Sequence, residues 1–408
     1  MEHIVDIKEG LSIILKNISV TRVIEKRLLN SPGYVLAEDI TAPFYYPPFT
    51  RSRMDGYGVF SGDFENLPTG SNLTLKIKGP CLGAGSQSRL KISPGETVRI
   101  MTGAVIPRGV DAVVPFEGVV RQGDYAQFTQ RVLTGDNISP AGEDFKKGRQ
   151  ILSQGDLVRP GDAALLASLG IDRVKVYARP RVGVLATGEE LIPLNSKREF
   201  GKIYNSNSYM VGSQVALNGG VPVYLGIAGD KKNITAGILK RQMSGLSVFV
   251  TTGGAARGKY DLTQEVFRSL GAEILFNRVS MKPGNYVVVA RKEGSFFFGL
   301  SGSPSAAFVS FQQLVRPLLW RLQGLKESGE AEINAELVGD IKGTFHEDRF
   351  YKAHTYVRRG VFYAEPNGSG LSSFAGVNSL IHIPPGKGPF GPGDEVKVQL
   401  LDLLISSI

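Results

Sequence analysis

Three glycine-rich turns in the second half of the chain have the composition of an anion-binding site. They occur in the segments VGVLATGEEL, VFVTTGGAARGKYDL and FFFGLSGSPSAAF, each after an apolar run, and we expect each to be a strand–turn–helix junction. Glycine lets the backbone approach a ligand closely, and free N–H groups at a helix start favour an anion by roughly 0.3–1 kcal/mol each at exposed sites. One such turn is weak evidence for a binding site, because a glycine turn after a strand is most often only a turn. Three from one sheet can hold one phosphorylated ligand, although none has a Walker or GxGxxG nucleotide-binding pattern.

Carboxylates lie beside these turns. Glu190 follows the first turn, Asp261 follows the second, and Asp230 comes after a further apolar run that ends at Ile227. Acids next to a phosphate favour a divalent cation that bridges them. The simpler interpretation places Glu190 and Asp261 in the first turns of helices, where an acid complements the helix dipole. The residues alone favour this simpler interpretation.

Two other positions are ambiguous. In PPFTRSRMDGYGVFSGD (47–63), turn-forming residues and aromatic rings surround Asp55, so this segment is either a loop anchored by Phe49 and Tyr57 or an acid that projects towards a partner site. Lys282 stands before Pro–Gly, where a lysine is more often a turn residue than an anion ligand. Spacing does not decide either case.

The elements that must position these residues follow from the hydrophobic pattern. From about residue 179, apolar runs alternate with helical segments, which is typical of a parallel sheet with helices on its faces. We expect strands at Val182–Ala186, Val221–Ile227, Ser247–Thr252 and Phe296–Leu300, and helices at Ser208–Asn218, Asn233–Met243, Asp261–Leu270 and Pro304–Leu322. Ligands bind outside the carboxyl ends of such strands, which is where the glycine turns and the acids would meet.

The rest of the chain is predicted to be mainly β. Short strands separated by turn residues fill the segment from about 73 to 128, a helix is expected at Asp162–Leu169, and a second β-rich region begins near residue 328. With 408 residues the chain is too long for one ordinary domain. We therefore expect a multidomain protein that combines an α/β domain with β domains.

Composition excludes several function classes. The net charge of +9 suits an anionic partner, but a solvated basic surface is the simpler explanation. Basic residues come in pairs rather than blocks, and no nucleic-acid-binding motif is present, so nucleic acid is not an expected partner. One cysteine and four histidines without ligand spacing argue against a zinc site and a Ser/His/Asp or Cys/His nucleophile set. No signal peptide and no bilayer-spanning apolar run are visible, so we expect a cytoplasmic protein without a membrane partner.

Several segments, in order, resemble the molybdopterin molybdenumtransferase (MoeA) family, which also includes the E domain of gephyrin. PPF and MDGYGV within 47–59 are similar to the family's PPF and MDGYAV, and VRIMTGAVIPRGVDAVVPFE (98–117) is similar to its R-I-x-T-G-A segment. GEDFKKG, RPRVGVLATGEEL, GKIYNSNSYM, TTGGAARGKYD and GLSGSP also have counterparts. Six or more ordered matches across nearly the whole chain are far more specific than one motif.

The resemblance implies a fold and a reaction. It implies an elongated domain (1–45 with 145–178), a β-rich inserted domain (46–144), a molybdopterin-binding α/β domain with a mainly parallel sheet (179–327) and a C-terminal β-barrel-like domain (328–408). It also implies a homodimer, with other cofactor-biosynthesis proteins as further partners. The reaction takes an anionic pterin, adenylylated molybdopterin, together with molybdate, and releases AMP. Mg²⁺ or another divalent cation assists it.

The resemblance also assigns site residues. The matched catalytic positions are Asp55, Thr102, Asp144, Glu190, Asp230 and Asp261, of which Glu190, Asp230 and Asp261 would hold the cation. The matched substrate-binding positions are Thr187, Gly188, Gly253, Gly254, Lys282, Gly302, Ser303, Lys352, Ser372 and Ser373. Among these, Lys282 matches the first lysine of the family's KPGKP molybdate loop, and Lys352 stands where the family carries an arginine that contacts molybdate.

The chain departs from the family pattern mainly in the molybdate loop. KPGKP reads KPGNY, with Asn285 and Tyr286 in place of lysine and proline, and lysine at 352 lacks the planar fork of arginine. Other departures are Ser301 and Ser303 in GLSGSP, Ala256 in TGGAA, Ser139 in the segment Asn137–Ile138–Ser139, and Asn205 in IYNSN. Since the cleft acids persist, these changes are expected to affect molybdate affinity more than pterin binding.

Three hypotheses remain open. The first is an active molybdotransferase, with AMP release that depends on molybdate. The second is a divergent paralogue that binds a pterin cofactor as a carrier or assembly partner, or that inserts another oxyanion such as tungstate. The third is a scaffold, as in the gephyrin lineage, which ranks lowest because nothing in the sequence provides an extra interaction domain.

Overall fold

A computed structural model describes residues 3–65, 68, 71–87, 89–253, 260–326, 332–401 and 406–407, with the backbone alone for 260, 261, 406 and 407. The chain divides into two compact units. The first unit consists of Met1–Glu38, Gln154–Ala163 and Asp172–Ile408, and the second consists of Asp39–Ser153 and Ala164–Ile171. The finer division into four domains stays a prediction.

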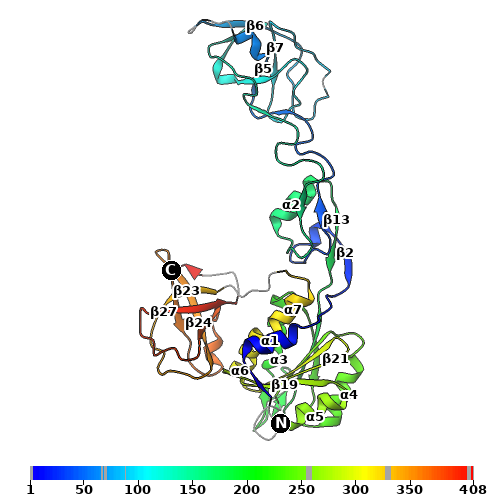
Figure 1. The fold of residues 1–408 in the computed structure, drawn as a ribbon, viewed down its shortest axis with the longest axis vertical. Helices are drawn as coiled ribbons and strands as arrows, with labels where there is room; N and C mark the ends of the chain where they lie inside the picture. The colour runs from blue at the N-terminus through cyan, green and yellow to red at the C-terminus, as the bar shows by residue number, and fades with distance from the viewer. Residues whose placement is uncertain are drawn as a thin grey trace. The chain divides into compact units, whose positions relative to one another are not determined.

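A seven-stranded sheet forms the core of the first unit (Figure 1). In spatial order its strands are β1 (Ile4–Val5), β19 (Glu273–Val279), β21 (Tyr286–Lys292), β22 (Ser295–Leu300), β18 (Val248–Thr252), β14 (Arg181–Ala186) and β17 (Val221–Ile227). Only β21 runs antiparallel to its neighbours; the other pairs are parallel. The predicted mainly parallel α/β sheet is therefore confirmed.

Helices cover both faces of this sheet. The helices α4 (Lys232–Gln242) and α5 (Tyr260–Ser269) pack on the opposite face from α1 (Ile7–Leu15) and α3 (Asn207–Leu217), as Figure 1 shows. Side chains alternate between the two faces along β22: Phe296 and Phe298 pack on the α3 side, while Phe297 packs on the α4 side. Full burial of each phenylalanine contributes about 1.5–3 kcal/mol. The apolar runs at β14, β18 and β22 are thus strands buried on both sides.

The N-terminus also belongs to this sheet, which the sequence did not predict. The strand β1 pairs in parallel with β19, and Ile14 of α1 is buried in the same core. The helix begins after Asp6, whose carboxylate accepts a hydrogen bond from the Glu9 N–H at 2.8 Å and so caps the helix. Local periodicity cannot reveal a pairing between segments so far apart in sequence.

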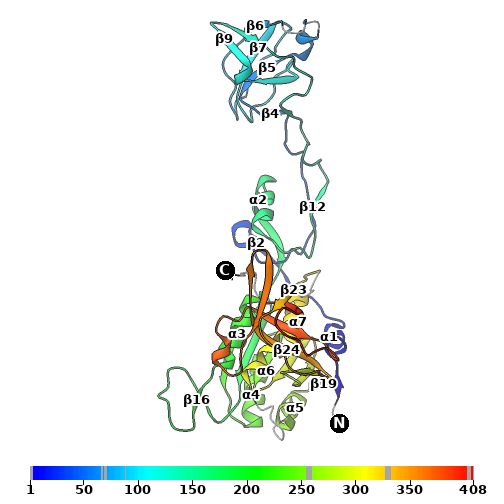
Figure 2. The ribbon, with the colours of Figure 1, turned by 90° about the vertical axis from the view of Figure 1, so that its left-hand side faces the viewer.

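The first glycine turn is not a strand–turn–helix junction. After β14 the chain forms a long loop with two short parallel strands, β15 (Leu191–Ile192) and β16 (Ile203–Tyr204), before α3 begins (Figure 2). The interpretation of Glu190 as a helix-dipole partner is therefore wrong. The intervening segment, PLNSKREFGK, is rich in turn formers and has no helical apolar period. The backbone of Asp261, in contrast, does lie in the first turn of α5.

The predicted helix Pro304–Leu322 is one helical stretch with an irregular middle. It consists of α6 (Pro304–Ser310), a π-helical turn (Phe311–Val315) and α7 (Arg316–Leu322). In the π turn the Arg316 N–H bonds to the Phe311 carbonyl, five residues earlier. Pro317 follows at once; it has no N–H to donate to an α-helical bond, so the wide turn precedes it.

Within the described chain, no helix combines the length and the apolar character needed to cross a bilayer.

The C-terminal segment forms a closed ring of strands, which confirms the barrel-like prediction. The strands β24 (Asp348–Arg358), β25 (Val361–Pro366), β23 (Glu332–Leu337), β27 (Glu395–Leu400) and β26 (Ser379–Ile383) pair in this order, and β26 pairs back with β24. A two-residue strand, β20 (Met281–Lys282), runs parallel to β24. This pairing joins the Lys282 loop of the α/β sheet to the barrel.

The second unit contains a six-stranded sheet, as the β-rich pattern predicted. Its order is β8 (Ala112–Pro115), β5 (Gly56–Val59), β7 (Glu96–Ile100), β6 (Leu73–Ile77), β10 (Tyr125–Phe128) and β9 (Val119–Gln122). The interpretation of 47–63 as a loop is wrong over β5, which is an inner strand between β7 and β8. Tyr57 is buried, as expected of an anchor, whereas Phe49 is exposed.

Gly56 is required by close approach of two strands. A Cβ atom at this position would lie 2.0 Å from the Val114 carbonyl oxygen. We therefore expect Gly56→Ala to lower the free energy of unfolding by about 1–3 kcal/mol, the usual cost of overpacking. Urea unfolding measures this, with Gly83→Ala of the same unit as control, because a Cβ at Gly83 meets no atom within 4 Å. Equal unfolding midpoints for the two variants would contradict the prediction.

Candidate active site

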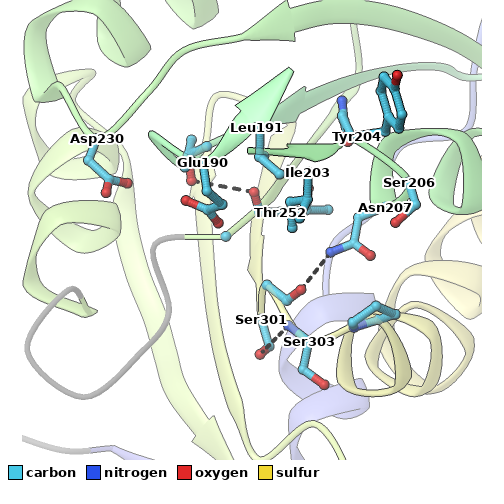
Figure 3. A pocket seen from close by; sticks show the side chains of 16 residues that line it. Glu190, Leu191, Ile203, Tyr204, Ser206, Asn207, Asp230, Thr252, Ser301 and Ser303 are labelled. Carbon is cyan, nitrogen blue, oxygen red and sulfur yellow. Dashed lines mark hydrogen bonds between the residues drawn. The ribbon is translucent and has the colours of Figure 1, made fainter. Parts of the chain in front are cut away.

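A pocket opens where the carboxyl ends of β14, β18 and β22 meet, and its volume is about 490 Å³. Seven of the residues predicted for the site line it: Thr187, Gly188, Glu190, Asp230, Gly253, Gly302 and Ser303. The three glycine turns are thus brought together as the topology predicted. Figure 3 shows side chains from these turns around one cavity, among them Glu190, Thr252, Ser301 and Ser303.

The backbone of Gly253 forms part of the pocket wall in a conformation that excludes other residues. Its φ is +101°, and a Cβ would lie 2.0 Å from the Thr187 carbonyl oxygen. The Thr187 N–H donates to the Thr252 carbonyl at 2.8 Å, which holds the ends of β14 and β18 together. Gly254 and Ala256 lie outside the described residues.

Two of the three predicted cation ligands face this pocket. The Glu190 carboxylate folds back over Gly188, with oxygens 2.8 Å from the position of a Cβ there. Asp230 lines the same cavity, and its N–H donates to the Glu189 carboxylate at 3.3 Å. Only the backbone of Asp261 is described. Among the side chains that the structure describes, no group of three or more His, Cys, Asp or Glu forms a complete metal cage.

One wall of the pocket was not predicted as part of the site. It comes from β16 and the start of α3, and it adds Ile203, Tyr204, Ser206 and Asn207 together with Asn205. Leu191, Thr252, Ser301 and Pro304 complete the lining. The asparagines of IYNSN were visible as a family match, but nothing local indicates that they meet the β22 turn. That contact is a hydrogen bond from Asn207 Nδ2 to the Gly302 carbonyl at 2.8 Å, across 95 positions.

Asn205 organises this wall. It is buried, and its Oδ1 accepts the Ser208 N–H at 3.2 Å. Its Nδ2 donates to Ser208 Oγ at 3.0 Å and to the Tyr224 hydroxyl at 3.2 Å. The side chain therefore fixes the first turn of α3.

The residues of the KPGNY segment (282–286) lie beside the barrel. Lys282 Nζ lies 3.2 Å from Glu347 Oε1, an ion pair between a half-exposed lysine and a more buried glutamate. The Asn285 carbonyl accepts the Val279 N–H at 3.0 Å, and the Arg278 guanidinium lies 5.0 Å from the Tyr286 ring centroid. Asn285 and Tyr286 thus both contact residues of β19.

Lys352 and Ser373 are brought into direct contact. Lys352 Nζ donates to Ser373 Oγ and, at 3.4 Å, to the Gly370 carbonyl, and it lies 3.8 Å from the Phe374 ring centroid. Ser372 belongs to the same short 3₁₀ helix, Ser372–Phe374. Burial lowers the pKa of the Lys352 ammonium below its ordinary value. Phe374 in turn packs edge-on against Phe308 of α6, the helix that starts at the pocket.

The remaining predicted catalytic residues lie in the second unit. Asp55 Oδ1 accepts two hydrogen bonds from Thr102, from its N–H and its Oγ1, each at 2.7 Å. The hydrogen bond from the Thr102 hydroxyl is the main cause that lowers the pKa of the Asp55 carboxyl, and the N–H adds to it. Within this unit Asp144 does not join the pair; its N–H donates to the Tyr46 carbonyl.

Two family models together match most of the chain. A model of the MoeA N-terminal region (domain I and II) matches residues 5–170, and a model of a probable molybdopterin binding domain matches residues 183–321. The molybdopterin molybdenumtransferase of Bacillus subtilis (strain 168) is 38% identical over 376 residues, which cover 90% of this chain and 87% of that protein. The chain belongs to the molybdopterin molybdenumtransferase family. Another member, from Staphylococcus aureus (strain Mu50), is 34% identical over 405 residues, 98% of this chain and 96% of that protein.

Solved structures agree with this assignment. The MoeA protein of molybdopterin biosynthesis from Pyrococcus horikoshii OT3 has a TM-score of 0.84 and 30% identity, and the alignment covers 98% of this chain and 100% of that one. In the present chain, the pocket with Glu190 and Asp230 lies within the match to the molybdopterin binding domain. Asp55 and Thr102 lie within the N-terminal match, and Lys352 follows both.

Proposed function

We propose that this protein inserts molybdate into adenylylated molybdopterin and releases AMP. The observation that carries the proposal is the pocket at the carboxyl ends of β14, β18 and β22, which combines three glycine-rich turns with Glu190 and Asp230. Backbone N–H groups in such turns bind phosphate oxygens. The acids would repel an anionic ligand unless a cation lies between them.

The donor set suits Mg²⁺ or a similar divalent cation. Mg²⁺ is commonly held by one or two carboxylates, with waters and substrate phosphates as its other ligands. Glu190 and Asp230 would supply the carboxylates, with Asp261 as a predicted third. When bound, the cation would neutralise charge on the phosphoanhydride between the pterin and AMP.

The residues of this chain would position the two substrates. The turns at Gly188, Gly253 and Gly302 hold the pterin adenylate, and Lys282 and Lys352 hold the molybdate oxyanion near the dithiolene. Bringing the reactants together in the correct geometry is itself a large part of such catalysis. The proposal includes a homodimer, which sedimentation equilibrium of the purified protein would detect.

The test is AMP release from adenylylated molybdopterin by the purified protein, with Mg²⁺, with and without molybdate, and with tungstate as comparator. We expect molybdate to stimulate AMP release and active cofactor to be recovered. Preferential stimulation by tungstate would favour insertion of another oxyanion. Tight pterin binding without any stimulated release would overturn the proposal and favour a carrier or assembly partner.

The substituted molybdate loop gives a separate prediction. We expect the double variant Asn285→Lys, Tyr286→Pro to lower the KM for molybdate about tenfold, because one charge-assisted hydrogen bond is worth roughly 1.5–3 kcal/mol. Position 286 is the first residue of β21, where proline is tolerated. Asn285→Gln with Tyr286 retained is the control, since it adds length without charge. If the double variant gives no gain in molybdate use, these positions do not limit the reaction.

A further inference from the structure

A carboxylate beside Lys282 has no role in the reaction as described so far. Glu347 lies in the bend just before β24, and its Oε1 is 3.2 Å from Lys282 Nζ and 3.4 Å from Arg349 Nη2. One carboxylate oxygen therefore contacts two cations. Lys282 is the residue to which the proposed function assigns the molybdate, so Glu347 takes up the positive charge that the oxyanion would use.

The backbone fixes Lys282 and Arg349 as neighbours. The strand β20 runs parallel to β24, and Lys282 stands opposite Arg349 in the register. The Phe345 ring centroid lies 4.3 Å from the Arg349 guanidinium carbon, a cation–π contact that holds the guanidinium. Glu347 precedes the first residue of β24 and lies outside this strand pairing. Arg349 is therefore an anchored partner that Glu347 can keep when it leaves Lys282.

Molybdate and the Glu347 carboxylate compete for the same ammonium group. Both are anions that accept hydrogen bonds from lysine, and two anions in contact with one ammonium repel each other. The ion pair is not sealed from water, since 47% of the Lys282 side chain and 24% of the Glu347 side chain are exposed. Pairs this exposed contribute little to stability. An oxyanion can thus replace Glu347 at Lys282 without loss of the fold.

The contact with Arg349 can tighten when Lys282 is released. Its 3.4 Å length exceeds the roughly 2.7–2.9 Å of a charge-assisted hydrogen bond. A guanidinium also has five N–H donors and can bind both oxygens of a carboxylate. Arg349 can therefore offset what Glu347 loses at Lys282.

We propose that Glu347 is a resident counter-anion that competes with molybdate for Lys282, and that Arg349 retains Glu347 when molybdate binds. The inference rests on the proposed function and deepens it, because it names two residues that set the affinity for the oxyanion. Glu347 is a positioning residue rather than a catalytic one, since it acts on molybdate through Lys282.

The first experiment measures AMP release by the full chain against molybdate concentration, with adenylylated molybdopterin saturating. We expect Glu347→Gln to lower the KM for molybdate roughly two- to fivefold, the range for one exposed ion pair, with kcat changed less than twofold. Glu332→Gln is the matched control: it removes a carboxylate of the same barrel that pairs with Lys397 at 3.6 Å, and its KM should stay at the wild-type value. A merely structural role for Glu347 would not tighten binding when the side chain is neutralised.

The second experiment tests Arg349 in two backgrounds. We expect Arg349→Met to raise the KM for molybdate roughly two- to fivefold in the wild-type background, because Glu347 then has Lys282 alone. In the Glu347→Gln background the same substitution should change the KM less than twofold, since no carboxylate is left to retain. Arg349→Lys keeps a cation and should stay within twofold of wild type. Melting temperatures of all variants accompany the kinetics.

The outcomes separate this inference from the proposed function. If wild type shows molybdate-stimulated release and Glu347→Gln has an unchanged or higher KM, Glu347 does not compete with molybdate, although the proposed function stands. If Glu332→Gln lowers the KM as much as Glu347→Gln, net charge explains the gain and the inference is wrong. An equal effect of Arg349→Met in both backgrounds would show that Arg349 acts independently of Glu347. If wild type shows no stimulated release, the proposed function fails and this inference falls with it.

Discussion

Asp230→Asn is expected to lower the rate of molybdate-stimulated AMP release by about 10²–10³-fold, the usual effect of removing one group that stabilises charge in the transition state. Asp230 lines the pocket at the end of β17, and its carboxylate is one of the two described there. Asparagine keeps the shape of the side chain but lacks the negative charge that Mg²⁺ prefers in its ligands. The measurement is AMP release under saturating substrates across a series of Mg²⁺ concentrations.

The dependence on Mg²⁺ separates a ligand from a merely structural acid. If Asp230 holds the cation, the variant needs more Mg²⁺ for half-maximal release, and high Mg²⁺ restores part of the rate. Glu25→Gln is the control, because the Glu25 carboxylate forms an exposed ion pair with Arg173 at 2.9 Å and exposed ion pairs contribute little to stability. If Asp230→Asn releases AMP at the wild-type rate at all Mg²⁺ concentrations, Asp230 is not a ligand of the cation.

Lys352→Met is expected to raise the KM for molybdate at least tenfold without loss of stability. Lys352 is 6% exposed, and a buried ammonium costs free energy that methionine of similar length does not. Its partner stays satisfied, since Ser373 Oγ also donates to the Gly370 carbonyl at 2.6 Å. Molybdate binding, in contrast, is weakened, because the variant lacks the positive charge that attracts the oxyanion. Steady-state AMP release against molybdate concentration, with thermal unfolding of the same samples, tests both effects; an unchanged KM would exclude Lys352 from molybdate binding.

The lowered pKa of Lys352 adds a pH dependence whose sign is defined. The ammonium is charged below this pKa, and its burial then opposes folding; as pH rises from the lowered pKa towards the ordinary value of 10.5, the folded state loses the proton first and this opposition is relieved. Molybdate binding changes in the opposite direction, because the neutral amine no longer attracts an oxyanion. We therefore expect the KM for molybdate to rise with pH in this alkaline window.

Lys352→Arg is the matched variant for this pH effect. A guanidinium keeps its charge throughout the range, so the alkaline rise in KM should disappear. Arginine also presents a planar fork that can bind an oxyanion through two hydrogen bonds. The same alkaline rise in Lys352→Arg would show that another group titrates.

Part of this architecture is determined by sequence alone. Strands buried on both faces have continuous apolar runs, so β14, β18 and β22 were predictable, and with them the edge at which Gly188, Gly253 and Gly302 meet. Asp230 follows the end of such a run, so its place at this edge follows from the topology of a parallel sheet. Glu190 was expected in a helix, and only the structure places it in the loop that follows β14.

Only the tertiary structure decided which segments far apart in the sequence contact one another. Asn207 reaches the β22 turn through one hydrogen bond, Lys352 of β24 donates to Ser373 of a 3₁₀ helix, and β1 joins the sheet beside β19. Hydrophobic periodicity reports which face of an element is buried, but it carries no information about which distant element covers that face. Polar contacts between distant loops leave no period at all, and for that reason the pocket wall from β16 and the start of α3 became visible only in the folded chain.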